Sequence, residues 1–186
     1  MNLDKETKKN LIHIARTTIN AAVKRTKVPD YEKEVATFPA LKEKAGAFVT
    51  IEKRGHLRGC IGYIEAREPL YKTVIMAARS AALNDDRFGP LQPDELNEIE
   101  LEISVLSTFS RVENINDIMV GTHGLMIESG FYHGLLLPQV ATEYQWDRIT
   151  FIEQTCHKAG LSKHAWREKT TVIKSFTAIV FNERDI

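Results

Sequence analysis

Hydrophobic residues recur along this chain with two periods, one typical of helices and one typical of strands. Residues 4–25 carry apolar side chains at helical spacing, with most basic side chains on the rest of the surface. This stripe consists of Ile12, Ala15, Ile19 and Ala22. Residues 98–108 instead begin with an alternation of apolar and polar positions, with Ile99, Leu101, Ile103 and Val105 on one face, which predicts a strand with one buried face. Three glutamates lie on its polar face, and because no histidine accompanies them we interpret them as a solvated face.

The remaining segments continue the same two patterns. Helices are predicted over 69–83 and 147–159, a short helix over 114–120, and a short helical turn near 93–96. Hairpins are predicted over 46–63 and 124–137, and a last strand over 171–181. Residues 31–44 are polar with few periodic apolar positions and are predicted to be an irregular connection.

Two segments of the chain follow the same order of elements. Gly55, Gly59 and the two residues after Gly59 match Gly130, Gly134 and the two residues after Gly134, at a constant offset. Each match lies in a hairpin that is followed by a helix and a strand. We therefore predict an α+β fold of duplicated hairpin–helix–strand units, which form antiparallel sheets flanked by helices. The whole chain, 1–186, is predicted to be one domain, with repeat units of about 46–108 and 122–182.

The hexapeptide Leu57-Arg58-Gly59-Cys60-Ile61-Gly62 carries the most distinctive chemistry of the chain. Strand alternation and a three-residue turn put Arg58 opposite Thr50, with Arg58 and Cys60 on one polar face and Leu57 on an apolar face. An arginine about 7 Å from a cysteine favours the thiolate, and Gly59 lets another backbone or a ligand approach closely. Cys60 is therefore a candidate nucleophile, and a buried free cysteine with packing glycines is the alternative.

The second repeat has His133 and Leu135 where the first has Arg58 and Cys60. This asymmetry favours a functional role for Arg58 and Cys60.

A polar loop follows the helix that ends near residue 83. Its residues Asp85, Arg87 and Phe88 can present a carboxylate, a guanidinium and a ring to a ligand. An Asp–Arg pair that only fixes the loop is equally consistent with the sequence.

Composition and charge narrow the class of protein. The chain has 186 residues, with 43% hydrophobic and 27% charged residues, as in ordinary globular proteins. Lysine plus arginine and aspartate plus glutamate both number 25, which argues against a broad nucleic-acid-binding surface. No apolar run is long enough to span a membrane, and two distant cysteines make no disulfide framework. We expect a cytoplasmic protein that has neither a metal site nor a cofactor.

Several motifs together make the chain resemble the AMMECR-type domain family. Besides the hexapeptide they are Asp85-Asp86-Arg87-Phe88, Ser104-Val105-Leu106-Ser107, Gly121-Thr122-His123-Gly124, Leu137-Pro138-Gln139-Val140-Ala141 and Lys158-Ala159-Gly160-Leu161. The family usually has Asp-Pro-Arg-Phe-Pro in the loop after the helix, whereas Asp86 and Gly89 replace the prolines here. The resemblance implies an α+β fold with a cleft near the hexapeptide. It also implies partnership with a radical-SAM protein and a Memo-like protein in a biomolecule-modification system.

Three functions remain open from the sequence. In the first, a small molecule or macromolecule binds around Arg58, Gly59, Asp85, Arg87, Phe88 and His123, and Cys60 acts as the reactive group. Any of His56, His123 and His133 that the fold brings near the thiol would be its base. In the second, the chain is a non-catalytic module that docks a partner or presents a substrate. The third, nucleic-acid binding, rests on the basic and aromatic stretch 163–169 and is opposed by the neutral charge balance.

Overall fold

The computed structural model describes residues 3–186 and divides the chain into two compact units. The first unit extends to Leu106 and includes the C-terminal residues Ile179–Ile186, and the second unit is Ser107–Ala178. The predicted second repeat, 122–182, therefore has its last residues in the first unit. Each unit has its own cluster of buried apolar residues. We describe each unit by itself.

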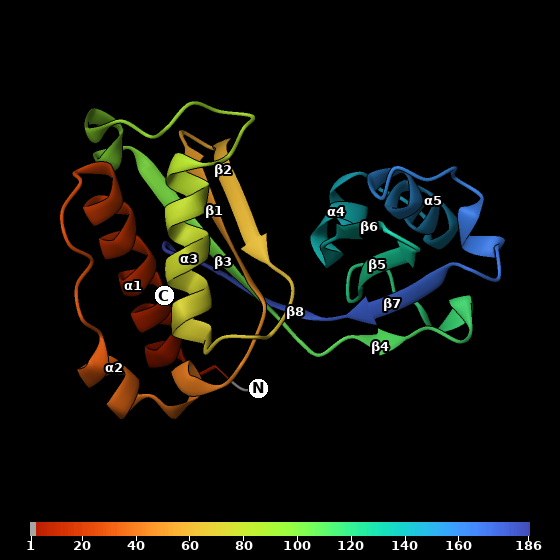
Figure 1. The fold of residues 1–186 in the computed structure, drawn as a ribbon, viewed down its shortest axis with the longest axis horizontal. Coiled ribbons are helices and arrows are strands. Elements are labelled where there is room, and N and C mark those ends of the chain that lie inside the picture. Colours follow the sequence, from red (N-terminus) through yellow and green to blue (C-terminus); the bar gives the residue numbers. More distant parts are fainter. Residues whose placement is uncertain (1–2) are drawn as a thin grey trace. The chain divides into compact units, whose positions relative to one another are not determined.

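The first unit is a sheet covered on one face by helices (Figure 1). Its strands lie in the order β2-β1-β3-β8, and β1 pairs antiparallel with both β2 and β3. In chain order its elements are α1 (Lys5–Val23), α2 (Glu32–Thr37), η1 (Pro39–Lys42), β1 (Ala47–Lys53), β2 (His56–Tyr63), α3 (Leu70–Leu83), η2 (Pro93–Asn97), β3 (Ile99–Leu106) and β8 (Ala178–Asn182). The long helices α1 and α3 lie side by side and bury their apolar faces against the sheet.

The local sequence explains where α1 begins and which face it buries. Asp4 is the N-cap residue, and its carboxylate accepts a hydrogen bond from the Thr7 backbone N–H at 2.7 Å. The predicted stripe is inside, because Ile12, Ala15 and Ile19 are all buried. The helix predicted from this stripe is therefore confirmed.

The first hairpin has a tighter turn than the sequence pattern suggested. Lys53 pairs with His56, so only Arg54 and Gly55 form the turn, both with positive φ as a type I′ turn requires. The register then shifts, because Ile51 faces Gly59 while the next residue of β1 faces Leu57.

Arg58 is thus the extra residue of a β-bulge. The bulge reverses the alternation before it, which corrects two predictions. Leu57 is 43% exposed and is not part of the apolar face. Thr50 lies opposite Cys60 and not opposite Arg58.

The second unit has the same basic plan around a sheet in the order β4-β7-β5-β6. Its elements are β4 (Ser110–Arg111), η3 (Ile115–Asp117), β5 (Gly124–Ser129), β6 (Tyr132–Leu136), α4 (Pro138–Glu143), α5 (Arg148–Lys158), η4 (Ala165–Arg167) and β7 (Val172–Phe176). Helix α5 packs on β5 and β6 and contributes the fully buried Phe151 and Ile152. Asp147 is the N-cap residue of this helix, and its carboxylate accepts a hydrogen bond from the Thr150 backbone N–H at 2.7 Å.

Four local predictions differ from the structure. The stretch 31–44 contains α2 and η1 and is not irregular throughout, and α4 begins at Pro138, where only the end of a hairpin was predicted. The short helix predicted over 114–120 is a single 3₁₀ turn, Ile115–Asp117. The strand predicted over 171–181 is two strands, β7 and β8, which belong to different sheets.

The two hairpin–helix–strand units share their strand order and one close packing contact. In both, the hairpin's first strand lies between its partner and the later strand, as β2-β1-β3 and as β6-β5-β7. A Cβ on Gly59 would collide with the carbonyl oxygen of Ala81, in the last turn of α3. A Cβ on Gly134 would collide in the same way with the backbone of Ala159, at the end of α5. The fold is therefore α+β, with two four-stranded antiparallel sheets.

Candidate functional site

The loop after α3 closes the exposed edge of the first sheet at Cys60. Strand β2 is an edge strand, and the Cys60 N–H donates to Oδ2 of Asp85 at 2.8 Å. The Cys60 carbonyl accepts from Nη2 of Arg87 at 3.2 Å. These two side chains take the place of a neighbouring strand and satisfy main-chain groups that an edge would otherwise expose.

Asp85 and Arg87 form a fork-to-fork ion pair. Nε of Arg87 donates to Oδ1 at 2.9 Å, and Nη2 donates to Oδ2 at 2.7 Å. The Asp85 side chain is only 2% exposed. The hydrogen bonds from Arg87, helped by the Cys60 N–H, outweigh burial and lower the pKa of Asp85 to about 2. The carboxylate is therefore ionised, and its two oxygens are used inside the protein.

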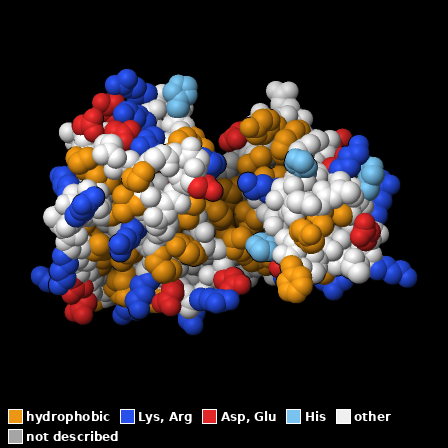
Figure 2. All heavy atoms as spheres, turned by 45° about the horizontal axis from the view of Figure 1, so that its top comes forward, with side chains coloured by type: hydrophobic (Ala, Val, Ile, Leu, Met, Phe, Trp, Pro, Cys, Tyr) orange, Lys and Arg blue, Asp and Glu red, His pale blue; other side chains and the backbone are white. Residues whose placement is uncertain are grey.

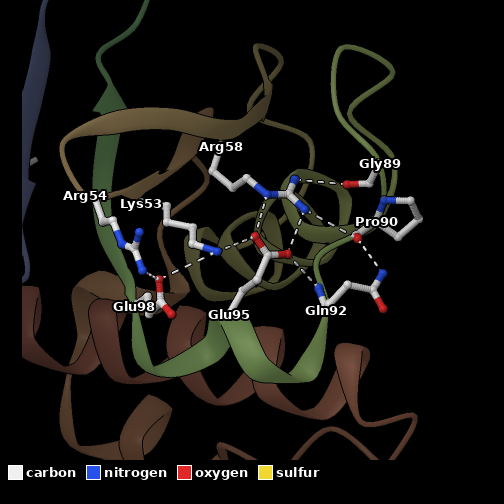
Figure 3. A network of polar contacts seen from close by, with 8 residues as sticks. All are labelled: Lys53, Arg54, Arg58, Gly89, Pro90, Gln92, Glu95 and Glu98. Carbon is white, nitrogen blue, oxygen red and sulfur yellow. Dashed lines mark hydrogen bonds and ion pairs between the residues drawn. The ribbon is translucent and has the colours of Figure 1, made fainter.

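Arg58 makes a second pair of this kind with Glu95, a residue of η2 (Figure 3). Its Nε donates to Oε1 at 3.0 Å and its Nη2 to Oε2 at 2.9 Å. The third nitrogen, Nη1, donates to the carbonyl of Gly89 at 2.9 Å. All three guanidinium nitrogens are thus engaged, and the side chain is only 18% exposed.

Glu95 is the centre of this network, and sequence reasoning missed it. Besides Arg58, it accepts hydrogen bonds from Nζ of Lys53 at 3.1 Å and from the backbone N–H of Gln92 at 2.9 Å. The Arg58 hydrogen bonds are the main reason that the pKa of Glu95 is lowered to about 2. The available signal was its position: a glutamate two residues after Pro93, in the first turn of a predicted helix, is placed to accept backbone N–H groups.

We expect acid to destabilise the first unit through Asp85 and Glu95. Each has a folded-state pKa of about 2, against about 4 in an unfolded chain. Their contribution is therefore complete above about pH 5 and is lost as the pH falls towards 2. By linkage each carboxylate accounts for roughly 2–3 kcal/mol of this loss. Urea unfolding between pH 5 and pH 2 measures this loss of unfolding free energy. Glu95→Gln should make the loss smaller by about the 2–3 kcal/mol that belongs to Glu95.

The matched control for this experiment is Glu68→Gln, because the Glu68 side chain is 47% exposed and pairs only with Lys72. This variant should keep the wild-type pH dependence. If the unfolding free energy falls equally steeply with pH in the wild type and in Glu95→Gln, the role given to Glu95 is contradicted.

The Cys60 thiol lies in a half-buried environment that disfavours its thiolate form. Oγ1 of Thr50, on the neighbouring strand, donates to its sulfur at 3.3 Å. Burial raises the pKa of the thiol, and this effect exceeds the lowering by the Thr50 hydrogen bond and by the charge of Arg87. The arginine that acts on the thiol is therefore Arg87, and not Arg58 as the strand pattern suggested.

The Phe88 ring lies near both arginines of the site. Its ring centroid is 6.0 Å from Cζ of Arg58 and 5.5 Å from Cζ of Arg87, within the range of cation–π attraction. The loop lacks the prolines of the usual family pattern, but Asp85, Arg87 and the Gly89 carbonyl hold it through hydrogen bonds. The predicted residues Arg58, Asp85, Arg87 and Phe88 thus meet around one loop.

The remaining predicted site residues lie elsewhere or have other contacts. Gly59 faces the end of α3. His123 belongs to the second unit, where its Nδ1 accepts from the Met119 backbone N–H at 3.2 Å. The other cysteine, Cys156, is fully buried in α5. Among residues 3–186, no three His, Cys, Asp or Glu side chains form a group that could hold a metal ion.

Fold and site together define a class of protein: an α+β chain of two hairpin–helix–strand units, with a loop clamped onto a strand edge by paired charges. Comparison with known proteins agrees with this description. The AMMECR1 family model matches residues 12–181. The chain therefore belongs to the AMMECR1 family.

Relatives and a solved structure extend over nearly the whole chain. A protein of Methanothermobacter thermautotrophicus is 42% identical over 190 residues, which cover 97% of this chain and 96% of the relative. A protein of Saccharolobus islandicus is 43% identical, with 97% of this chain and 83% of the relative covered. The crystal structure of the uncharacterised protein PH0010 from Pyrococcus horikoshii superposes with a TM-score of 0.91 at 37% identity. That match covers 97% of this chain and 93% of PH0010.

Within residues 3–186, no helix is long and apolar enough to cross a membrane.

Proposed function

We propose that this chain is a non-catalytic binding module of a biomolecule-modification system. Its working surface is the Asp85–Pro90 loop, which the hexapeptide strand and Glu95 hold in one conformation. The partners are a radical-SAM protein and a Memo-like protein, as the resemblance to AMMECR-type domains implies. The module docks one of them or presents a substrate to it.

A single observation carries this proposal: the charged side chains of the predicted site bind one another. Asp85 accepts bonds from Arg87 and from the Cys60 amide, and Arg58 uses all three of its nitrogens within the unit. A catalytic site needs polar groups directed at a substrate and a nucleophile with a lowered pKa. Here the pKa of the thiol is raised, and the loop exposes a preformed surface around the half-buried Phe88.

Nucleic acid is a weaker candidate than protein for the bound macromolecule. On the face drawn in Figure 2, basic and acidic side chains are interspersed on both units. A nonspecific nucleic-acid-binding surface needs basic side chains gathered along a stripe or patch.

A binding titration tests the proposal. Purified chain is titrated by calorimetry with the radical-SAM protein and the Memo-like protein encoded in the same genome. Phe88→Ala should weaken binding about 10-fold, because an aromatic ring at the centre of a contact is a typical hot spot. Cys60→Ser should bind as the wild type does, since the thiol contributes no bond to the loop surface.

Thiol labelling supplies the outcome that would overturn a non-catalytic role. Iodoacetamide should label Cys60 in the folded chain more slowly than a free thiol at every pH between 6 and 10, because burial raises the pKa of Cys60. Cys156→Ser provides the single-thiol background. Rapid labelling of Cys60 at neutral pH, or failure of both proteins to bind, would refute the proposal.

A further inference from the structure

A hollow of about 550 Å³ opens in the first unit beside the C-terminal end of α1. It is lined by α1, by α3 and by the residues just before and at the start of η2. Its apolar lining includes Ala21, Val23, Val28, Leu83 and Leu91. The volume lies within the range of roughly 300–1,000 Å³ that small-molecule sites occupy.

Two arginines without partners line this hollow. Among residues 3–186, nine of the eleven arginine side chains contact a carboxylate, a carbonyl oxygen or an aromatic ring. The two that do not are Arg25 and Arg79, and both line the hollow. No acidic residue is among the described residues of the lining. The hollow therefore combines an apolar wall with two uncompensated guanidinium groups.

The backbone conformation at Arg25 is a second, independent indication that this arginine serves a bound ligand. Arg25 has a φ of 55° and follows the C-cap of α1. The N–H of Arg25 donates to the carbonyl of Ala22, and the N–H of Thr26 donates to that of Ala21, as in a Schellman motif. Glycine is the residue that this position favours, because a side chain at positive φ is strained. Favourable interaction with the helix dipole explains a basic residue here, but not the unpartnered Arg79 on another helix.

The wall opposite the two helices is fixed in place. The N–H of Leu91 donates to the carbonyl of Ala82 in α3 at 2.8 Å, which ties the loop to the helix. Nη2 of Arg58 reaches the carbonyl of Pro90 at 3.4 Å, and Glu95 accepts from Gln92 (Figure 3). The hollow is therefore preformed, which lowers the entropic cost of binding.

We propose that this hollow binds a small ligand made of an oxyanion and an apolar body, with Arg25 and Arg79 holding the oxyanion. Guanidinium groups match carboxylate and phosphate oxygens in a planar, bidentate arrangement. The apolar body lies against Val28, Leu83 and Leu91. The lining includes Pro90, the last residue of the Asp85–Pro90 loop, but not Phe88, and the proposal does not rest on the partners proposed above.

NMR titration of the full ¹⁵N-labelled chain tests this site. The probes are phenyl phosphate, phenylacetate and the neutral benzyl alcohol. The two anions should shift the amide signals of residues around the hollow, and whichever binds more tightly identifies the oxyanion as phosphate or carboxylate. Arg25→Gln and Arg79→Gln should each weaken binding about 10-fold, the loss of one charged hydrogen-bonded contact.

Arg67→Gln is the matched control, because it removes one exposed arginine outside the lining and should leave binding unchanged. Arg25→Gly gives a signature that a purely structural arginine would not produce. It should raise the melting temperature by about 2 °C through relief of strain and still weaken anion binding. Three results would overturn the proposal. They are binding of benzyl alcohol as tight as that of the anions, a loss of anion affinity in Arg67→Gln equal to that in Arg25→Gln and Arg79→Gln, and no amide shifts around the hollow with either anion.

Discussion

Asp85→Ala is expected to lower the free energy of unfolding by about 3 kcal/mol. The substitution leaves the Arg87 guanidinium without its carboxylate and the Cys60 N–H without an acceptor. Both lost interactions attach the loop to the edge strand β2, so the loop should also detach locally from this strand. Urea unfolding at pH 7 measures the stability. Hydrogen exchange of the Cys60 amide measures the local opening, which should rise much more than at residues of β1.

Asp86→Ala is the matched control, since Asp86 is the exposed neighbour in the same loop. An exposed substitution of this kind changes stability by less than about 0.5 kcal/mol. If Asp85→Ala and Asp86→Ala unfold at the same urea concentration, the Asp85 carboxylate does not hold the loop to the strand. Unchanged exchange of the Cys60 amide in Asp85→Ala would contradict the same interpretation.

The long periodic elements were predictable because burial imposes its period on the sequence. The apolar stripe of α1 and the alternation in the first half of β3 each indicate a single buried face. From Ile103 to Leu106 every residue of β3 is buried, so the alternation does not describe the end of this strand. Short elements lack this signal. Helix α2 has six residues, none of them buried, so its sequence carries no hydrophobic period. The division of 171–181 into β7 and β8 depends on which sheet each half joins, and pairing between distant strands leaves no mark within one strand.

The residues of the site were predictable by type, but most of their contacts were not. The hexapeptide and the following loop do come together, because β2 and α3 are consecutive elements of one unit. The partner of Arg58 could not be predicted, because the bulge removes Arg58 from the regular alternation. The contact of Glu95 with Arg58 was missed because the two residues lie 37 positions apart in the chain, beyond the reach of any local pattern.

The different residues at the matching positions of the two hairpins, Arg58 and His133, also have a structural explanation. Arg58 is present in the first unit, where Glu95 and the Gly89 carbonyl need a donor. His133, at the matching position of the second unit, lies opposite Glu128 in the β5–β6 pair. The two residues therefore have different neighbours, and the contacts of Arg58 support a positioning role for it.

Gly59→Ala is expected to destabilise the first unit by about 3 kcal/mol, near the upper end of the usual cost of overpacking. The new methyl group would collide with the carbonyl oxygen of Ala81, a backbone atom of α3 that cannot rotate away. Either the last turn of α3 or the strand must move, and both are attached to the Asp85 loop. Urea unfolding measures the loss, and hydrogen exchange should show the opening concentrated at the end of α3.

Gly134→Ala should have the same effect in the second unit, because its methyl group would meet the backbone of Ala159. Gly89→Ala is the control, since a Cβ there meets no atom within 4 Å. If Gly59→Ala and Gly134→Ala lower the free energy of unfolding equally, the glycine at this position of each hairpin serves strand–helix packing in its own unit. The rest of the hexapeptide then divides clearly. Arg58 holds the loop through Glu95 and the Gly89 carbonyl, and Cys60 contributes its main chain to Asp85 and Arg87. These residues of the hexapeptide therefore build and hold one surface loop.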